Sequence, residues 1–347
     1  MNIAVIGAGF YGCYLAYKLK NKYPKSKILL FEKEKKILSQ SALNNQYRLH
    51  QGFHYPRSEK TIRQTFNGEK IFKEEFKKYI FYPKKNIYAI HKNSKISFND
   101  YKKVYKRLNI PFSELSKNKY SFYFEKPEHI EGAILTSEGV ILLDKLYKEF
   151  KKKYLKNINI FTNTEVTNIN NKGFLTTNNK KNYSLDLIFN TTNINPNLGL
   201  KNKYFKLKYE IAVMAYVKNF YNRNIAITIM DGNFISVYPL SSNLTSLSSV
   251  KFTPVYKTKS IKRLIKFKNS INPKNYCNLI INDIRKYLKI PKKVNVIKMT
   301  FSPKVKLIKD TGSKRIATFY KEKKIISIMC GKLDAAPILW SKINKII

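Results

Sequence analysis

The spacing of apolar residues at the start of the chain predicts a strand, a helix and a second strand in succession. Residues 2–6 and 28–31 are short apolar runs of the length of buried strands. Between them, residues 10–21 carry Tyr14, Leu15 and Leu19 at the spacing of a helix. This order is typical of an α/β fold with parallel strands.

The same patterns predict further elements along the rest of the chain. We expect helices at residues 59–79, 99–108, 143–154, 261–267, 278–288 and 338–346. We expect strands at residues 87–91, 120–124, 158–161, 185–190, 211–217, 225–229, 234–238, 247–252, 294–299, 316–320 and 325–329, and several short strands within 164–177. Asp231, Gly232 and Asn233 form a tight-turn signal that joins two of these strands in a hairpin. The region from about 206 to 301 is therefore predicted to be mostly sheet with a few helices.

Three glycines after the first strand have the spacing of a dinucleotide-binding turn. Gly7, Gly9 and Gly12 form G-x-G-x-x-G between the predicted strand and helix. The first glycine permits the tight turn, the second lets the backbone approach a pyrophosphate, and the third lets the helix and strand pack closely. Glu32 ends the second strand and is placed to accept hydrogen bonds from a ribose diol. The motif predicts a dinucleotide site and leaves NAD and FAD both open.

A second stretch gathers histidines and arginines in a short aromatic segment. Residues 44–58 contain Arg48, His50, His54 and Arg57, and loops on a rigid scaffold often carry functional groups. The segment resembles the second flavin-binding motif of the D-amino-acid-oxidase-like (DAO) FAD oxidoreductases, nearest the branch of 2-hydroxyglutarate oxidases and glycerol-3-phosphate dehydrogenases. The matching residues are Asn45, Leu49, His50, Gly52 and Tyr55, and Ser39, Gln40 and Ser41 stand where that family has a small polar run near the FAD pyrophosphate.

Later positions extend the resemblance and also depart from it. Val166 stands where the family has a valine whose backbone faces the adenine, and residues 331–333 resemble the last FAD motif of the glycerol-3-phosphate dehydrogenase branch. Residues 191–193 replace the family's usual small-small-Gly turn against FAD, but asparagine tolerates a left-handed backbone, so we expect the turn to persist. Asp334 and Ala335 replace hydroxyl residues of that branch, which indicates a different substrate.

The resemblance implies an α/β fold combined with antiparallel β-structure. A Rossmann-like FAD-binding domain would comprise residues 1–80, 130–200 and 310–347, interwoven with a mainly antiparallel substrate domain of residues 81–129 and 201–309. It also implies FAD as the cofactor and hydride transfer from a C–H bond next to an amine or hydroxyl. The implied substrate is a small anion such as an amino acid, a 2-hydroxy acid or a sugar-like compound. The electron acceptor, oxygen or another carrier, is left open.

The expected site residues combine the motifs with these implications. His50 is a candidate base because its unperturbed pKa lies near neutrality, and it is equally a candidate structural contact to the flavin. Arg48 and Arg57 are candidates to clamp an anion by paired hydrogen bonds, or else cofactor-phosphate or surface residues. The catalytic candidates are His50, Arg57, Tyr55 and Tyr238, with core packing as the alternative for the two tyrosines. The cofactor-binding candidates are Gly7, Ala8, Gly9, Phe10, Tyr11, Gly12, Glu32, Lys33, Ser41, Asn45, Arg48, His50, Val166, Thr192, Gly331, Lys332 and Leu333.

Composition sets broader limits. The chain of 347 residues, 43% of them hydrophobic, is long enough for two domains with a real core. Its three scattered cysteines form no C-x-x-C, so we expect neither a disulfide framework nor a metal site. The sequence contains neither paired carboxylates nor a nucleophile motif, so it does not indicate a hydrolase. We see no basic leader and no apolar run long enough to span a bilayer, and we expect a cytoplasmic protein.

The formal net charge of +45 has two interpretations. The lysines are spread along the whole chain, and Lys, Asn, Ile, Tyr and Phe, which have AT-rich codons, are all abundant, so we favour compositional drift. The alternative is a functional basic surface for an anionic substrate, RNA or a membrane. Two rival functions stay open as well. One is a flavoenzyme acting on a large anionic partner, such as tRNA or a nucleotide-linked sugar, and the other is a non-catalytic dinucleotide-binding protein.

Overall fold

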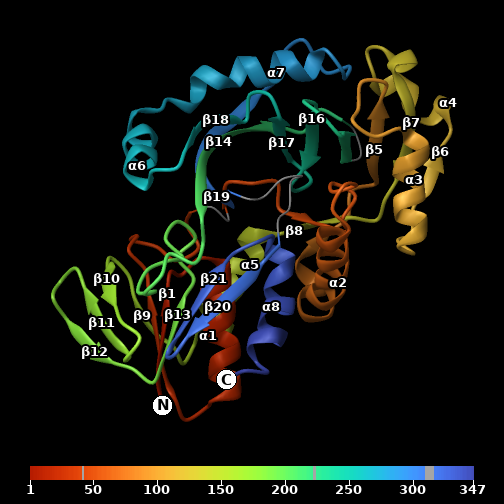
Figure 1. The fold of residues 1–347 in the computed structure, drawn as a ribbon. Coiled ribbons are helices and arrows are strands. Elements are labelled where there is room, and N and C mark those ends of the chain that lie inside the picture. The colour runs from red at the N-terminus through yellow and green to blue at the C-terminus, as the bar shows by residue number, and fades with distance from the viewer. Residues whose placement is uncertain (41–42, 222–223, 309–315) are drawn as a thin grey trace.

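The first of two principal sheets has six strands and carries the glycine motif (Figure 1). The computed structural model describes residues 1–40, 43–221, 224–308 and 316–347. The strand order is β20-β21-β13-β1-β2-β9, and all neighbours are parallel except β20, which runs antiparallel to β21. The strands are β1 (Asn2–Ile6), β2 (Lys27–Phe31), β9 (Asn159–Phe161), β13 (Leu187–Asn190), β20 (Thr318–Glu322) and β21 (Ile325–Met329). The predicted parallel α/β core is thus present.

Side chains of β1 alternate between two faces of this sheet. Ile3 and Val5 belong to a hydrophobic core on the side of the helices, whereas Ala4 and Ile6 belong to a second core on the opposite side. The helices on the first side are α1 (Phe10–Lys22), α2 (Glu59–Phe76), α5 (Leu143–Glu149), which continues as a π-helix over Phe150–Tyr154, and α8 (Ala336–Ile343). A small antiparallel sheet covers the other side and consists of β10 (Val166–Ile169), β11 (Phe174–Thr177) and β12 (Asn182–Ser184).

The second principal sheet has nine strands and is mostly antiparallel (Figure 1). Its order is β18-β14-β17-β16-β15-β5-β7-β6, with β19 also paired to β14, and only β5 and β15 are parallel neighbours. Its strands are β5 (Lys85–His91), β6 (Ser113–Leu115), β7 (Ile130–Leu135), β14 (Leu207–Lys218), β15 (Ile225–Met230), β16 (Ile235–Pro239), β17 (Leu244–Ser249), β18 (Pro254–Thr258) and β19 (Val296–Leu307). The predicted hairpin at Asp231–Asn233 joins β15 to β16 and is confirmed.

Four further α-helices and a second small sheet complete the α-helices and sheets of the described residues. Helix α6 (Ile261–Ser270) lies against β14 and β18, and α7 (Cys277–Arg285) lies against β14, β16 and β17. Helices α3 (Phe98–Arg107) and α4 (Lys117–Tyr120) lie against β7. The small sheet, ordered β3-β8-β4, contains β3 (Arg48–Leu49), β4 (Ile80–Phe81) and β8 (Gly139–Ile141). No helix in the described parts of the chain combines the length and apolar character needed to cross a bilayer.

Two predictions about local structure need correction. Residues 120–124, expected to be a strand, form the end of α4 and a 3₁₀ turn over Ser121–Tyr123. The burial explains the error, because Tyr120, Tyr123 and Phe124 are buried while Phe122 is 53% exposed, which is a helical spacing of apolar positions. The strand predicted at 247–252 begins and ends three residues earlier, as β17.

One boundary between the two proposed domains also moves. Residues 130–135 were expected to return to the dinucleotide-binding part, but they form β7, which pairs with β5 and β6 in the nine-stranded sheet. A short apolar run has the same appearance in either sheet, so the sequence pattern could not assign it. We retain the two-domain division as a proposal, with the return placed after β7.

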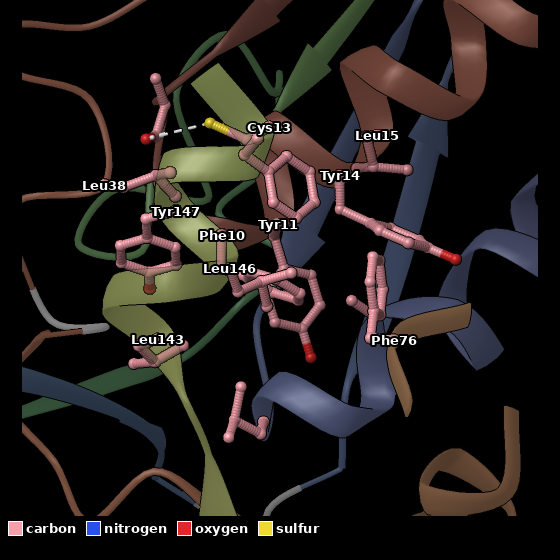
Figure 2. Close-up of a cluster of buried hydrophobic side chains, with 14 of the residues drawn as sticks. Phe10, Tyr11, Cys13, Tyr14, Leu15, Leu38, Phe76, Leu143, Leu146 and Tyr147 are labelled. Carbon is pink, nitrogen blue, oxygen red and sulfur yellow. Dashed lines mark hydrogen bonds between the residues drawn. The ribbon is translucent and has the colours of Figure 1, made fainter. Parts of the chain in front are cut away.

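A dense aromatic core fixes the position of helix α1 (Figure 2). The ring of Phe10 lies 6.0 Å from that of Phe72 in α2 and 5.7 Å from that of Phe150 after α5. Tyr14 lies 6.2 Å from Phe76 in the same core. Full burial of one such side chain stabilises the fold by about 2 kcal/mol. The first residue of α1 is therefore anchored, and the start of the helix is held rigidly at the end of β1.

Candidate active site

The glycine turn brings the start of α1 against the end of β1. Gly7 has φ +91°, a conformation that favours glycine, and its N–H donates to the carbonyl of Phe31 at 2.8 Å. A Cβ on Gly12 would lie 1.9 Å from the carbonyl oxygen of Gly7, so only glycine permits this packing. Gly9 is the N-cap of α1 and offers no side-chain cap to the first N–H groups. These groups and the positive end of the helix dipole form an anion-binding position.

Glu32 lies beside this turn at the end of β2. Its Oε2 accepts a hydrogen bond from the Ala8 N–H at 2.8 Å, and its Oε1 accepts one from the Glu34 N–H at 3.0 Å. Burial raises the pKa of this carboxyl, and the two backbone hydrogen bonds oppose the shift. The structure therefore places one acidic side chain next to the glycine turn, as the motif predicted.

The turn at residues 191–193 is held against the glycine turn by a threonine. The Thr191 hydroxyl lies 2.8 Å from the carbonyl oxygens of both Ile6 and Gly7, and its N–H donates to Ile6 at 2.9 Å. Asn193 is not among the described residues with positive φ. The turn thus persists as expected, but without the left-handed asparagine that we anticipated.

A cavity of about 850 Å³ runs from the glycine turn to the nine-stranded sheet. Gly9, Glu32 and Val166 line one part of it, and Met214, Ser236 and Lys304 line the part formed by the nine-stranded sheet. Its size lies within the range of cofactor and substrate pockets. One continuous space therefore joins the dinucleotide motif to the sheet expected to bind substrate.

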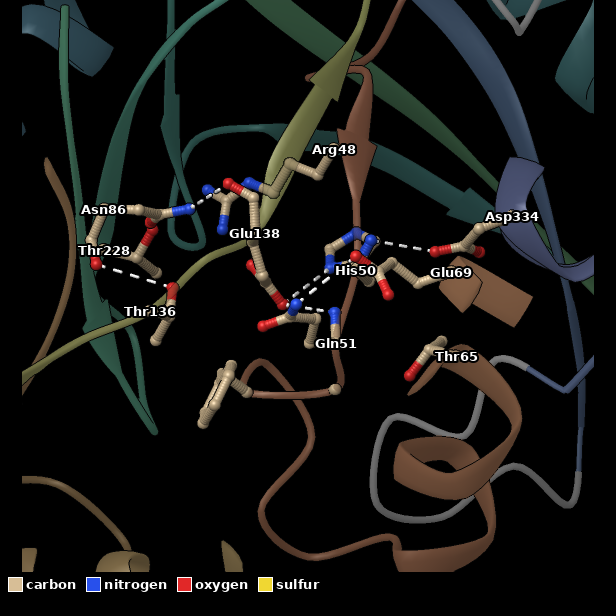
Figure 3. A network of polar contacts seen from close by, with 12 residues as sticks. Arg48, His50, Gln51, Thr65, Glu69, Asn86, Thr136, Glu138, Thr228 and Asp334 are labelled. Atoms are coloured by element: carbon tan, nitrogen blue, oxygen red, sulfur yellow. Dashed lines mark hydrogen bonds and ion pairs between the residues drawn. The ribbon is translucent and has the colours of Figure 1, made fainter. Parts of the chain in front are cut away.

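Arg48 and Tyr88 form a buried polar contact beside this cavity. Figure 3 shows Arg48 close to Glu138. Arg48 donates to the Tyr88 hydroxyl at 3.1 Å, to Gln46 Oε1 at 2.8 Å and to the Ser236 hydroxyl. Its guanidinium lies 4.0 Å from the centre of the Tyr238 ring. These partners occupy Arg48 within the protein, and only 5% of the residue is exposed.

His50 lies between two buried carboxylates (Figure 3). Its backbone N–H donates to Asp334 Oδ2 at 2.9 Å, and its Nδ1 is 3.9 Å from Glu138 Oε1. Burial, followed by the charges of Lys332 and Arg48, lowers the pKa of His50 well below its ordinary value. A neutral imidazole at the cavity wall is therefore the prevailing form at neutral pH, and a neutral imidazole is able to accept a proton.

The C-terminal motif lines the cavity beside His50. The Tyr11 hydroxyl donates to the Lys332 carbonyl at 2.6 Å and accepts from the Gly331 N–H at 3.2 Å, which ties α1 to this segment. The Lys332 ammonium lies 5.5 Å from the centre of the Tyr55 ring. The motif at 331–333 is thus held beside the stretch at 48–55, although nearly three hundred residues separate them.

The structure brings most predicted site residues to the cavity wall. The residues on the wall are Gly7, Gly9, Phe10, Tyr11, Glu32, Lys33, Asn45, Arg48, His50, Tyr55, Arg57, Val166, Thr192, Gly331, Lys332 and Leu333. Ala8 and Gly12 do not line it and act through the backbone packing of the turn. Ser41 lies outside the described residues.

Two of the predicted catalytic residues do not have the surroundings that we expected. Tyr238 does not reach the cavity, because it is fully buried behind Arg48 and its hydroxyl bonds to Asn86 and Gly139. Arg57 is bound in a bidentate ion pair with Asp231, at 2.6 and 3.1 Å. Its guanidinium is therefore committed to the β15–β16 hairpin and is not a ready clamp for an anion.

Sequence reasoning missed Glu138 as a site residue and treated Asp334 only as a departure from the family pattern. Both residues are completely buried. A usable signal was present, because each acidic residue stands beside small residues between predicted elements, and buried carboxylates require partners. The identity of those partners depends on contacts between residues far apart in the chain.

Burial of Asp334 predicts a specific dependence of stability on pH. Burial raises the pKa of Asp334 to about 7, while the His50 N–H and Lys332 oppose the shift. Between the unfolded pKa near 4 and this value, the folded chain keeps a proton that the unfolded chain releases. Stability then falls as pH rises, by up to about 1.4 kcal/mol per pH unit. We expect Asp334→Asn to abolish this contribution.

Urea unfolding of the Asp334→Asn variant and the unchanged protein, compared at pH 5 and pH 7, tests this prediction. The variant should gain stability relative to the unchanged protein as the pH rises. The other titrating groups are the same in both proteins, so their contributions to the pH dependence cancel in the difference. An equal difference at both pH values would show that Asp334 is ionised throughout the range.

Comparisons with known proteins identify a family and similar chains. A family model described as FAD dependent oxidoreductase (DAO) matches residues 2–244. An FAD-dependent monooxygenase of Fusarium mangiferae, FPY4, is 24% identical over 277 residues, which cover 78% of this chain and 70% of that protein.

Two solved structures show the same fold. An L-α-glycerophosphate oxidase from Mycoplasma pneumoniae with FAD bound has a TM-score of 0.75 at 20% identity, covering 99% of this chain and 94% of that one. A glycine oxidase from Geobacillus kaustophilus has a TM-score of 0.69 at 12% identity, with coverage of 99% and 93%.

Proposed function

The chain belongs to the DAO family of FAD-dependent oxidoreductases, and we propose that it oxidises a C–H bond next to a hydroxyl or amine of a small anionic substrate. FAD, when bound, would supply the acceptor for the hydride of this carbon. The remaining proton of the hydroxyl or amine must pass to a base as the C=O or C=N bond forms. The observation that carries the proposal is the buried His50 on the wall of the cavity that begins at the glycine turn.

The residues present fit FAD. The start of α1 presents uncapped N–H groups beside Gly9, and a Cβ added to Gly9 would meet no described protein atom within 4 Å. This open position lies where a pyrophosphate needs close access to the backbone. Glu32 stands beside it for the ribose hydroxyls. The cavity then continues past Val166 and Thr192 to the residues around His50, which leaves room for the flavin end and a substrate.

The charges on the cavity wall support an anionic substrate. Besides Arg57 and its partner Asp231, seven basic and four acidic residues line the cavity. The basic residues are Lys33, Arg48, Lys95, Lys268, Lys304, Lys306 and Lys332, and the acidic residues are Glu32, Glu34, Glu165 and Glu210, of which Glu210 pairs with Lys306 at 2.5 Å. The local field is therefore positive, and a positive concave surface concentrates anions. Arg57 is not included in this set, because Asp231 already pairs with its guanidinium.

The visible absorption spectrum of the purified protein tests the proposal directly. We expect a flavin spectrum, and anaerobic bleaching by at least one member of a panel of 2-hydroxy acids, amino acids, amino sugars and glycerol phosphates. Admission of air after bleaching then shows whether oxygen accepts the electrons. The bleaching compound identifies the substrate class.

Two outcomes would contradict parts of the proposal. A yellow protein that no small molecule bleaches would favour a large anionic partner, such as tRNA or a nucleotide-linked sugar, or a non-catalytic dinucleotide-binding role. A colourless protein that also fails to take up added FAD would show that these residues do not hold this cofactor.

A further inference from the structure

The carboxylate of Glu138 is the strongest feature of the site without an assigned role. The residue lies just before β8 and is completely buried. Its Oε2 accepts from the Tyr88 hydroxyl at 2.5 Å, and its Oε1 accepts from the Gln51 N–H at 2.8 Å. Donors from two distant parts of the chain thus converge on one carboxylate. Figure 3 shows Glu138 and Gln51 beside His50.

The hydrogen bonds around Glu138 require it to act as an acceptor. Arg48 donates to the Tyr88 hydroxyl at 3.1 Å, so the tyrosine's own proton is directed to Glu138. The Gln51 N–H can only donate, so both carboxylate oxygens already accept hydrogen bonds. Burial raises the pKa of Glu138, whereas these donors and the charges of Arg48 and Lys332 favour the ionised form. An ionised Glu138 still has acceptor capacity on Oε1.

The imidazole of His50 is the hydrogen-bond donor that suits Glu138 Oε1. Its Nδ1 is buried and has no hydrogen-bond partner in the described parts of the chain, and Glu138 Oε1 lies 3.9 Å away. A buried ring nitrogen without a partner is costly, which favours an imidazole rotation that closes this gap. In free enzymes such contacts are often long and tighten when the site is filled. Because Nδ1 is enclosed, Nε2 is the nitrogen left to face the cavity.

We propose that Glu138 is a positioning residue for His50. Its carboxylate accepts a hydrogen bond from Nδ1–H of the imidazole, which keeps the proton on Nδ1 and leaves Nε2 unprotonated toward the substrate. This inference rests on the proposed role of His50 as the base. When Nε2 takes up the substrate proton, the imidazolium carries its positive charge next to the Glu138 carboxylate, which stabilises it. This stabilisation opposes Lys332, Arg48 and His54, which all disfavour the charged form of His50.

Asp334 has a different relation to His50. It holds the backbone N–H of His50 and does not contact the ring nitrogens in the described structure. Glu69 is connected to this group through the side chain of Gln51, from which its Oε1 accepts a hydrogen bond at 3.3 Å. The same oxygen pairs with the Lys73 ammonium at 2.5 Å. Of these three buried carboxylates, only Glu138 is placed to select the proton position on the ring.

Nitrogen-15 NMR of histidine-labelled, FAD-loaded protein tests the proposal without relying on activity. The chain has four histidines, so four imidazoles contribute, and His50→Gln identifies the signal of His50. We expect the unchanged protein to carry the His50 proton on Nδ1. Observation of the proton on Nε2 would overturn the proposal with no variant needed.

Two matched variants extend the test. Glu138→Gln keeps the size of the side chain and removes the charge, and it should lower the Nδ1–H population of His50 and slow substrate-dependent flavin bleaching by roughly 10- to 100-fold. Glu69→Gln removes another buried carboxylate from the same network and should change neither. An unchanged tautomer and rate in Glu138→Gln would overturn the proposal.

The two readouts separate this inference from the proposed function. A protein that no panel compound bleaches contradicts the proposed function, while the tautomer of His50 still decides whether Glu138 positions the ring. A protein that bleaches normally, with His50 protonated on Nε2, contradicts this inference alone.

Discussion

Replacing Gly9 with alanine is expected to weaken FAD binding about 100-fold, or about 2.7 kcal/mol, while the apoprotein folds normally. The structure explains why the two effects separate. Gly9 has φ −71° and ψ −175°, which alanine adopts readily, and an added Cβ would meet no described protein atom within 4 Å. The methyl group would project into the space where the pyrophosphate must approach the backbone. Titration of the apoprotein with FAD, followed by flavin fluorescence, measures the first effect, and thermal melting of the apoprotein measures the second.

Gly12→Ala provides the contrasting variant from the same motif. Its Cβ would lie 1.9 Å from the Gly7 carbonyl oxygen, so it should destabilise the apoprotein itself. A Gly9→Ala protein that binds FAD as tightly as the unchanged protein would show that the cofactor does not pass over this turn. The pair thus distinguishes a glycine that the cofactor requires from one that the fold requires.

Replacing His50 with glutamine is expected to slow substrate-dependent flavin bleaching by roughly 10²- to 10⁴-fold, the range for loss of a general base. The ring lines the cavity, and its lowered pKa keeps it neutral and able to accept a proton at neutral pH. If the role of His50 is that of a base, FAD retention should stay unchanged. Stopped-flow bleaching with the substrate found for the unchanged protein, together with the FAD content of the purified variant, gives both quantities.

The alternative role, a structural contact to the flavin, predicts the reverse pattern. In that case the variant would lose FAD and the remaining loaded fraction would react at nearly the normal rate. His129→Gln is the matched control, since His129 is a partly exposed histidine outside the cavity wall. It should alter neither quantity.

The local sequence determined the elements whose structure depends on residues close together in the chain. The first strand, helix and second strand are β1, α1 and β2, with bounds within one residue of those predicted. The glycines and Glu32 meet at one edge of the sheet because a strand, a tight turn and a helix leave little freedom in how they connect. Continuous apolar runs also indicated most strands of the nine-stranded sheet, because strands such as β14, β15 and β16 are buried at nearly every position.

Tertiary structure decided everything that depends on residues far apart in the chain. It placed residues 130–135 in the nine-stranded sheet, committed Arg57 to Asp231, and buried Tyr238 behind Arg48. It also surrounded His50 with Glu138 and Asp334, which no local spacing connects. A side chain's partner, burial and pKa are set by what the completed fold packs around it, whereas a strand or a glycine turn is set largely by its own neighbours. The glycine turn could therefore be predicted from the sequence, whereas the partners of His50 could not.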